Sequence, residues 1–117
     1  MSRLELEIAF ETKELRDLCH HEAVSSANLS TSAAEALKKR LSDIHAADWI
    51  GEILAGRPRK GRWKTNECYF FELDDGFVLA VIPNHLKQRL NNDGQIDWST
   101  VRRVKVVYLG ERNEPHR

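Results

Sequence analysis

A short run of cations is the feature of this chain whose residue types could do chemistry. Five of the eight residues from 57 to 64 are basic, and no acid interrupts them. The chain holds 18 basic and 18 acidic side chains, so the residues outside this run carry 13 cations against 18 anions. A concentrated positive field on an otherwise acidic chain is typical of a phosphate-binding surface. We call residues 57–64 the basic segment. Its cations are Arg57, Arg59, Lys60, Arg62 and Lys64.

The other residues of the basic segment suit a nucleic-acid ligand. Pro58 and Gly61 bend the backbone, and Trp63 offers a flat ring that can stack on a base or anchor the core. RNA is cleaved without a metal when its own 2′-hydroxyl attacks the phosphorus, provided that the protein aligns the atoms, neutralises the phosphorane and moves protons. The candidate charge stabilisers are Arg59, Lys60 and Arg62. The alternative interpretation is a solubilising turn before a strand.

Further candidates lie towards the C-terminus. His116 is the candidate general acid or base, because histidine exchanges a proton near neutral pH, although it sits in a tail that is expected to be frayed. His85 is the alternative proton carrier, or simply a loop histidine. Tyr108 either faces a ligand, where it can stack on a base or donate a proton, or packs in the core. The residues expected to contact RNA are Arg57, Trp63, Lys64, His85, Arg103, Lys105 and Tyr108.

Bulk composition narrows the class of protein. The length of 117 residues predicts one domain, and 41% hydrophobic with 31% charged residues is typical of a globular chain. No apolar stretch approaches membrane-spanning length, and the charged N-terminus does not resemble a signal peptide, so a cytoplasmic location is expected. Cys19 and Cys68 lie far apart and are expected to be reduced, and the Cys and His spacings match no zinc site. No metal or other cofactor is therefore expected.

The first half of the chain predicts one strand and two helices. Apolar residues alternate over 4–10, which indicates a half-buried strand. Thr12 is placed to cap a short helix that carries Leu15, Leu18 and Cys19, and a polar stretch over 25–31 then interrupts the pattern. Ser32 and Glu35 form a capping box for a longer helix that runs to about residue 45. A further turn over 48–54 ends at Gly56.

The second half predicts strands. A strand over 68–73, an Asp-Asp-Gly turn at 74–76 and an apolar strand over 77–82, stopped by Pro83, read as a hairpin. A polar loop over 85–95 precedes a last strand over 101–109, and residues 111–117 are expected to be a flexible tail. In the last strand, strict alternation places Val104, Val106 and Tyr108 on one face and Arg103, Lys105, Val107 and Leu109 on the other.

This order of elements predicts an α+β fold. Two to three helices would pack on one face of a small antiparallel sheet of about four strands, in one domain over residues 1–117. The opposite face would remain available for a ligand, where Arg103 and Lys105 would extend the positive field of the basic segment.

Several short motifs, in this order and spacing, resemble a known family. They are the opening strand and helix over 4–19, Arg40-Leu41-Ser42-Asp43-Ile44 with Ala46-Ala47, Arg59-Lys60-Gly61, Phe71-Glu72, and Gly94, Ile96-Asp97-Trp98-Ser99, Val101, Val104 and Val106. The chain resembles the HigB-like killer branch of the RelE/ParE toxin superfamily over nearly its full length. Two positions differ: Cys68 stands where the family usually has an arginine, and Asn113 stands where the family often has a histidine.

The resemblance implies a RelE-like fold and a toxin of a type II toxin–antitoxin pair. Such a toxin is a metal-independent endoribonuclease that cleaves mRNA on the ribosome and forms a complex with a small antitoxin, often of helix-turn-helix type. Two alternatives stay open. One is a non-catalytic protein of the same fold that binds an antitoxin, or a gyrase-directed toxin as in the ParE branch. The other is a general RNA- or DNA-binding module, whose affinity would fall steeply with salt.

Overall fold

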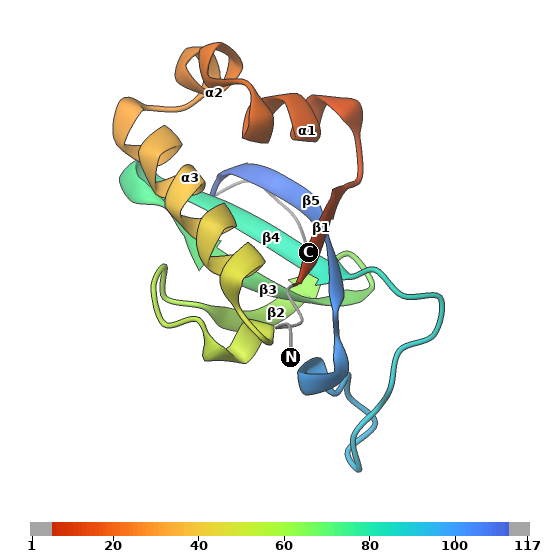
Figure 1. Cartoon of the computed structure of the whole chain (residues 1–117). Helices are drawn as coiled ribbons and strands as arrows, with labels where there is room; N and C mark the ends of the chain where they lie inside the picture. The colour runs from red at the N-terminus through yellow and green to blue at the C-terminus, as the bar shows by residue number, and fades with distance from the viewer. Residues whose placement is uncertain (1–5, 113–117) are drawn as a thin grey trace.

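The strands that the apolar pattern predicts assemble into a single sheet, and the three α-helices lie along one side of it (Figure 1). The computed structural model describes residues 6–112, except for the side chains of Glu22 and Ser26. The predicted α+β class is confirmed. The helices are α1 (Lys13–His20), α2 (Glu22–Asn28) and α3 (Thr31–Ala46), and the strands are β1 (Glu7–Phe10), β2 (Arg59–Trp63), β3 (Asn66–Glu72), β4 (Phe77–Pro83) and β5 (Arg103–Glu111).

Within residues 6–112 the sheet has five strands, in the order β1-β5-β4-β3-β2. Strand β1 runs parallel to β5, whereas the other neighbouring strands are antiparallel, so the sheet is mixed rather than antiparallel as predicted. The sequence predicted about four strands, and the sheet has one more. The additional strand is β2, which comes from the basic segment. None of the helices within residues 6–112 is long and apolar enough to cross a membrane.

The helices differ from the predictions mainly where serines occur. Thr12 caps α1 as predicted, and its Oγ1 accepts a hydrogen bond from the Leu15 amide at 3.1 Å. The polar stretch over 25–31 was wrongly predicted to be irregular, because α2 occupies most of it and buries Ser25. The N-cap of α3 is Ser30 rather than Ser32: the Ser30 hydroxyl accepts from the Ala33 amide at 3.1 Å. Tertiary packing of α2 against α1 and α3 overrides the weak helix propensity of serine.

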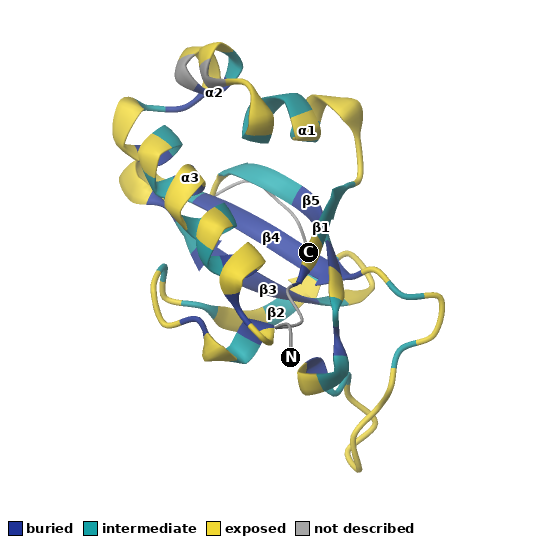
Figure 2. Cartoon of the chain, viewed as in Figure 1, coloured by how far each residue is buried: buried dark blue, intermediate teal, exposed yellow. Residues whose placement is uncertain are grey.

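The main hydrophobic core fills the space between the helices and the sheet (Figure 2). Its buried members from α3 are Ala33, Leu37 and Ile44, which recur at helical spacing on one face. The strands contribute alternate residues such as Phe71 and Leu79. The sheet face that looks away from the helices, called the far face, carries a second and smaller cluster of Cys68, Phe70, Ala80, Ile82 and Val107.

A β-bulge in β5 changes which residues reach the far face. Ala80 pairs with Tyr108 but the next residue, Val81, pairs with Val106, so Val107 is an extra residue in β5. Val107 and Tyr108 consequently both lie on the far face, and Leu109 packs against the main core. The strict alternation predicted for this strand is therefore right for Val107 but wrong for Tyr108 and Leu109.

The end of β5 extends further than expected. Glu111 belongs to the strand, and the Arg112 amide donates to the Gly76 carbonyl at 2.8 Å, so the predicted flexible tail does not begin at residue 111. The rest of that tail, 113–117, and the start of the predicted first strand, residues 4 and 5, lie outside the described residues.

Candidate nucleic-acid interface

Most of the basic segment is an edge strand. Residues 59–63 form β2 and pair with β3, with Gly61 opposite Cys68, and the backbone turns at the two ends, where Arg57 has φ 46° and Lys64 has φ 55°. Side chains alternate between the two faces of a strand. The cations of the basic segment are therefore divided between the faces of the sheet.

The register decides which cation goes where. Arg59 pairs with Phe70, a member of the far-face cluster, so Arg59 lies on the far face. Lys60 pairs with Tyr69, whose ring is part of the main core, and therefore lies on the helix side, as does Arg62. The Arg62 guanidinium donates to the Thr65 carbonyl at 3.0 Å, within its own hairpin. The three candidate charge stabilisers Arg59, Lys60 and Arg62 therefore do not converge on one phosphate-binding site.

Cations lie beside two of the aromatic rings on the far face, Trp63 and Phe70. The Trp63 and Tyr108 ring centroids are 5.0 Å apart with an interplanar angle of 33°, and the Lys64 ammonium lies 5.7 Å from the Trp63 ring. The Arg59 guanidinium lies 5.3 Å from the centroid of Phe70. This combination of stacking surfaces and cations is typical of sites for single-stranded nucleic acid.

Small residues make room for these rings. A Cβ added at Gly61 would lie 2.6 Å from a Phe70 ring carbon, so glycine at this position lets the Phe70 ring lie over β2. Cys68, which is fully buried, stands on the neighbouring strand. Burial raises the pKa of the Cys68 thiol to about 12, and the nearby Arg59 guanidinium lowers it only partly. The thiol is therefore neutral at physiological pH and supplies no charge at the position where the family resemblance implies an arginine.

Glu72 binds the guanidinium groups of two arginines. Its Oε2 accepts from Arg59 Nη1 at 3.2 Å, and its Oε1 accepts from Arg112 Nη2. The carboxylate bridges two cations as an RNA phosphate would. Glu72 also lines a polar cleft of about 580 Å³ at the end of the sheet, and the cations of that cleft are Lys39, Arg40, Arg57 and Arg112.

The cations of β5 have acidic neighbours in β1 and directly after it. Lys105 Nζ lies 3.7 Å from a Glu11 carboxylate oxygen, and Arg103 Nε lies 3.9 Å from one of Glu7. Lys105 pairs with Ile82 of the far-face cluster, and Arg103 precedes it by two residues on the same face. These pairs are partly or largely exposed, so salt screens them and a phosphate can compete for the cations.

Of the two candidate histidines, the structure describes only His85. His85 Nε2 accepts hydrogen bonds from the backbone amides of Arg102 and Arg103 at 3.0 and 3.2 Å, which occupies its acceptor nitrogen in a structural role. His116 lies outside the described residues.

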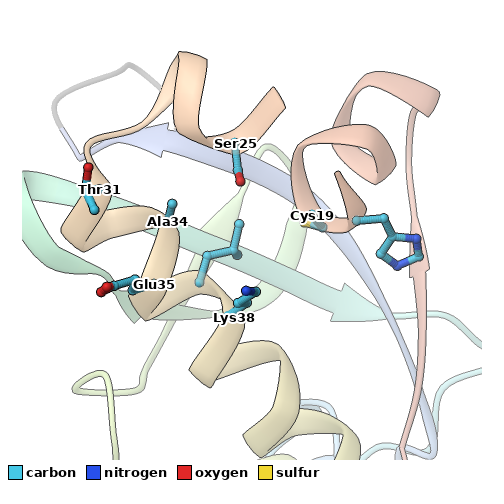
Figure 3. A pocket seen from close by; sticks show the side chains of 8 residues that line it. Cys19, Ser25, Thr31, Ala34, Glu35 and Lys38 are labelled. Atoms are coloured by element: carbon cyan, nitrogen blue, oxygen red, sulfur yellow. The ribbon is translucent and has the colours of Figure 1, made fainter. Parts of the chain in front are cut away.

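A separate cleft of about 300 Å³ lies among the three helices (Figure 3). Cys19 of α1, Ser25 of α2 and Lys38 of α3 line it from different sides. Burial raises the pKa of the Cys19 thiol to about 12, so this cysteine is a poor nucleophile. Within residues 6–112, no group of three or more His, Cys, Asp and Glu side chains is arranged to hold a metal ion.

Three residues of the interface were not candidates from sequence. Phe70, Glu72 and Arg112 become relevant through their contacts with Arg59 or with one another. The period of two in a strand places Phe70 and Glu72 on one face with Cys68, but only the pairing of β3 with β2 shows that Arg59 lies on that face.

Comparison of the chain with protein-family models, curated proteins and solved structures gives no match. Function is therefore inferred from the residues of the far face.

Proposed function

We propose that the far face binds single-stranded RNA and that the chain is a type II toxin that cleaves mRNA on the ribosome. The observation that carries this proposal is the tilted Trp63–Tyr108 ring pair, which has Lys64 beside it and Arg59 on the same face. Base stacking on an aromatic ring contributes about 1–3 kcal/mol per base and tolerates any sequence. A paired duplex hides its base faces, so the interface favours a single strand.

The cleavage chemistry would centre on Arg59. Of the three proposed charge stabilisers, Arg59 alone shares the face of the aromatic pair, whereas Lys60 and Arg62 would act only from the edge of β2. An incoming phosphate would compete with Glu72 for Arg59, and His116 remains the proposed proton carrier. The reaction uses the RNA's own 2′-hydroxyl and requires no metal.

The partners proposed with this function follow from the resemblance to the RelE/ParE toxin superfamily. A small antitoxin, of the helix-turn-helix type, would cover the cationic surface with acidic and apolar groups, and the protein would act in the cytoplasm on ribosome-bound mRNA. Charge complementarity of this kind mainly accelerates association.

A second candidate is a non-catalytic or gyrase-directed protein of the same fold. Two observations favour this second candidate. Arg59 already forms an ion pair with Glu72, and the buried Cys68 supplies no cation where the resemblance implies one. Loss of a guanidinium that contacts a transition state lowers a rate by orders of magnitude.

Tightly controlled expression in bacteria tests the proposal. We expect growth arrest and cleaved transcripts, both abolished by Arg59→Ala and retained by Arg16→Ala, which removes an exposed cation of α1 that belongs to no proposed site. Normal growth with intact transcripts would contradict the nuclease proposal. Cys68→Arg then separates the candidates, because a gain of cleavage marks a weakened nuclease and no gain favours the binding protein.

RNA binding is measured separately, by fluorescence anisotropy with a labelled single-stranded oligonucleotide and a duplex of the same sequence. We expect tighter binding of the single strand, and an affinity that falls as salt rises. Equal affinity for the two, or no binding at low salt, would contradict the stacking interface itself.

A further inference from the structure

Four large apolar side chains are prominent on the surface of the described part of the chain. Their exposed fractions are 37% for Trp49, 87% for Leu54, 107% for Leu86 and 61% for Leu90. Single exposed apolar residues are ordinary, but several in neighbouring segments mark an interaction site. These four come from only two segments, 47–55 and 84–97, the second of which we call the leucine loop.

The two segments lie at the same end of the molecule. The first contains the 3₁₀ turn η1 (Ile50–Glu52), which packs against η3 (Trp98–Thr100), the turn that follows the leucine loop. Arg102 Nη1 also donates to the Asp48 carbonyl at 3.3 Å. In Figure 1 the leucine loop extends from the end of β4 and projects away from the sheet before the chain returns to β5.

The leucine loop is held in shape by hydrogen bonds that do not involve its leucine side chains. The Asn84 amide donates to the Arg103 carbonyl at 2.8 Å, the Asp97 amide to the Arg89 carbonyl at 2.8 Å, and the Ile96 amide to Glu67 Oε2 at 2.9 Å. A loop fixed in this way loses little conformational entropy when it binds. Leu86 and Leu90 are thus presented outward on a pre-organised support.

The first segment forms a cleft that matches the leucine loop. The cleft, called the acidic cleft, has a volume of about 310 Å³ and is lined by Asp43, Ala46, Ala47, Glu52, Ile53, Leu54 and Ala55. Its lining is mostly apolar, with the carboxylates of Asp43 and Glu52 among it, and Asp43 also forms an ion pair with Arg40 at 3.2 Å. Residues 43–55 contain three acids and no Lys or Arg, whereas 86–90 contain Lys87 and Arg89 and no acid. Apolar surface and opposite charge therefore occur on two parts of one chain.

We propose that the chain forms a homodimer in which the leucine loop of each copy docks into the acidic cleft of the other. Leu86 and Leu90 would cover the alanines and Ile53, while Lys87 and Arg89 would face the carboxylates. Because loop and cleft lie at the same end of the molecule, a two-fold axis brings each loop to the other copy's cleft and closes the assembly. The dimer does not depend on the proposed RNA function.

Sedimentation velocity over a wide concentration range measures the association directly. We expect a monomer–dimer equilibrium that Leu86→Ser with Leu90→Ser weakens by at least tenfold, about the effect of losing an apolar anchor. At concentrations where the wild-type chain is monomeric, thermal unfolding of this variant should be unchanged, because both leucines are exposed. Lys87→Glu with Arg89→Glu should also weaken the dimer, and adding Asp43→Lys with Glu52→Lys to that variant should restore it.

Zero-length cross-linking in a mixture of isotopically heavy and light chains identifies the surfaces. We expect heavy–light cross-links between Lys87 and Glu52 or Asp43. A chain that stays monomeric at all concentrations, as it would if this surface served a different partner, overturns the proposal. A dimer whose heavy–light cross-links avoid these residues, or one that the leucine variant does not weaken, overturns it as well.

Discussion

The two faces of the sheet differ in composition although the same strands build both. On the helix side, large apolar residues of the strands meet apolar residues of α3, and Phe71 is fully buried there. On the far face, the next-door residue Phe70 belongs to a small cluster that Trp63 and Tyr108 border, with the Arg59 guanidinium over its ring. Consecutive residues of one strand thus serve stability on one side and a candidate binding surface on the other.

The largest expected effect separates these two phenylalanines. Phe71→Ala should lower the free energy of unfolding by about 3–5 kcal/mol, because it leaves a cavity in the main core. Phe70→Ala should lower the free energy of unfolding by less, because the far-face cluster is smaller and its neighbours can relax into the space that the ring leaves. Urea unfolding of both variants checks the order, and an equal or larger loss for Phe70→Ala would contradict the ranking of the two faces.

The second prediction concerns the thiol beneath the far face. The pKa of Cys68 is about 12 rather than 9.0, so near neutral pH its thiolate fraction should be roughly a thousandfold lower in the folded chain than in the unfolded chain. Alkylation of Cys68 should therefore be slow in the folded chain and fast in urea. Because the folded-state pKa is the higher one, the stability contributed by the buried neutral thiol is complete below pH 9.0 and decreases as pH rises towards 12. Mass spectrometry after a timed alkylation measures the protection, and rapid native labelling would place the thiol in a different environment.

The third prediction compares two tryptophans. Trp63→Ala should weaken binding of single-stranded RNA by about 1–3 kcal/mol, because it removes a stacking ring. The matched control is Trp49→Ala, which removes a partly exposed ring from segment 47–55. Anisotropy titrations should show the loss for Trp63→Ala only, and equal losses would mean that the far face is not the site.

The smallest expected effect is an increase in affinity. Glu72→Gln removes the carboxylate that engages Arg59 and Arg112, so RNA affinity should rise by a few fold, and the salt dependence should steepen by about 0.7 for each additional phosphate that the released arginines bind. Unfolding free energy should change by no more than about 1 kcal/mol, since these ion pairs are partly exposed. Titrations at several salt concentrations test this, and an unchanged slope would show that Glu72 does not compete with RNA.

Local signals predicted much of the fold. The Thr12 cap, the Asp-Asp-Gly turn between β3 and β4, and the stop at Pro83 each depend on a few adjacent residues, and the structure confirms them. The errors at α2 and at the start of α3 occur where several serines compete as caps, so that packing between helices decides. The parallel pairing of β1 with β5 joins segments nearly a chain length apart and leaves no local mark.

The sequence alone determined that cations concentrate at residues 57–64 and that apolar periodicity builds an α+β fold, because composition and spacing are properties of neighbouring residues. Only the tertiary structure decided how these cations are shared. The pairing of β2 with β3 sends Arg59 to the far face and Lys60 and Arg62 to the other, and the bulge at Val107 brings Tyr108 to Trp63. Register and bulges arise from contacts between distant strands, and a one-residue shift reverses the face of every side chain that follows.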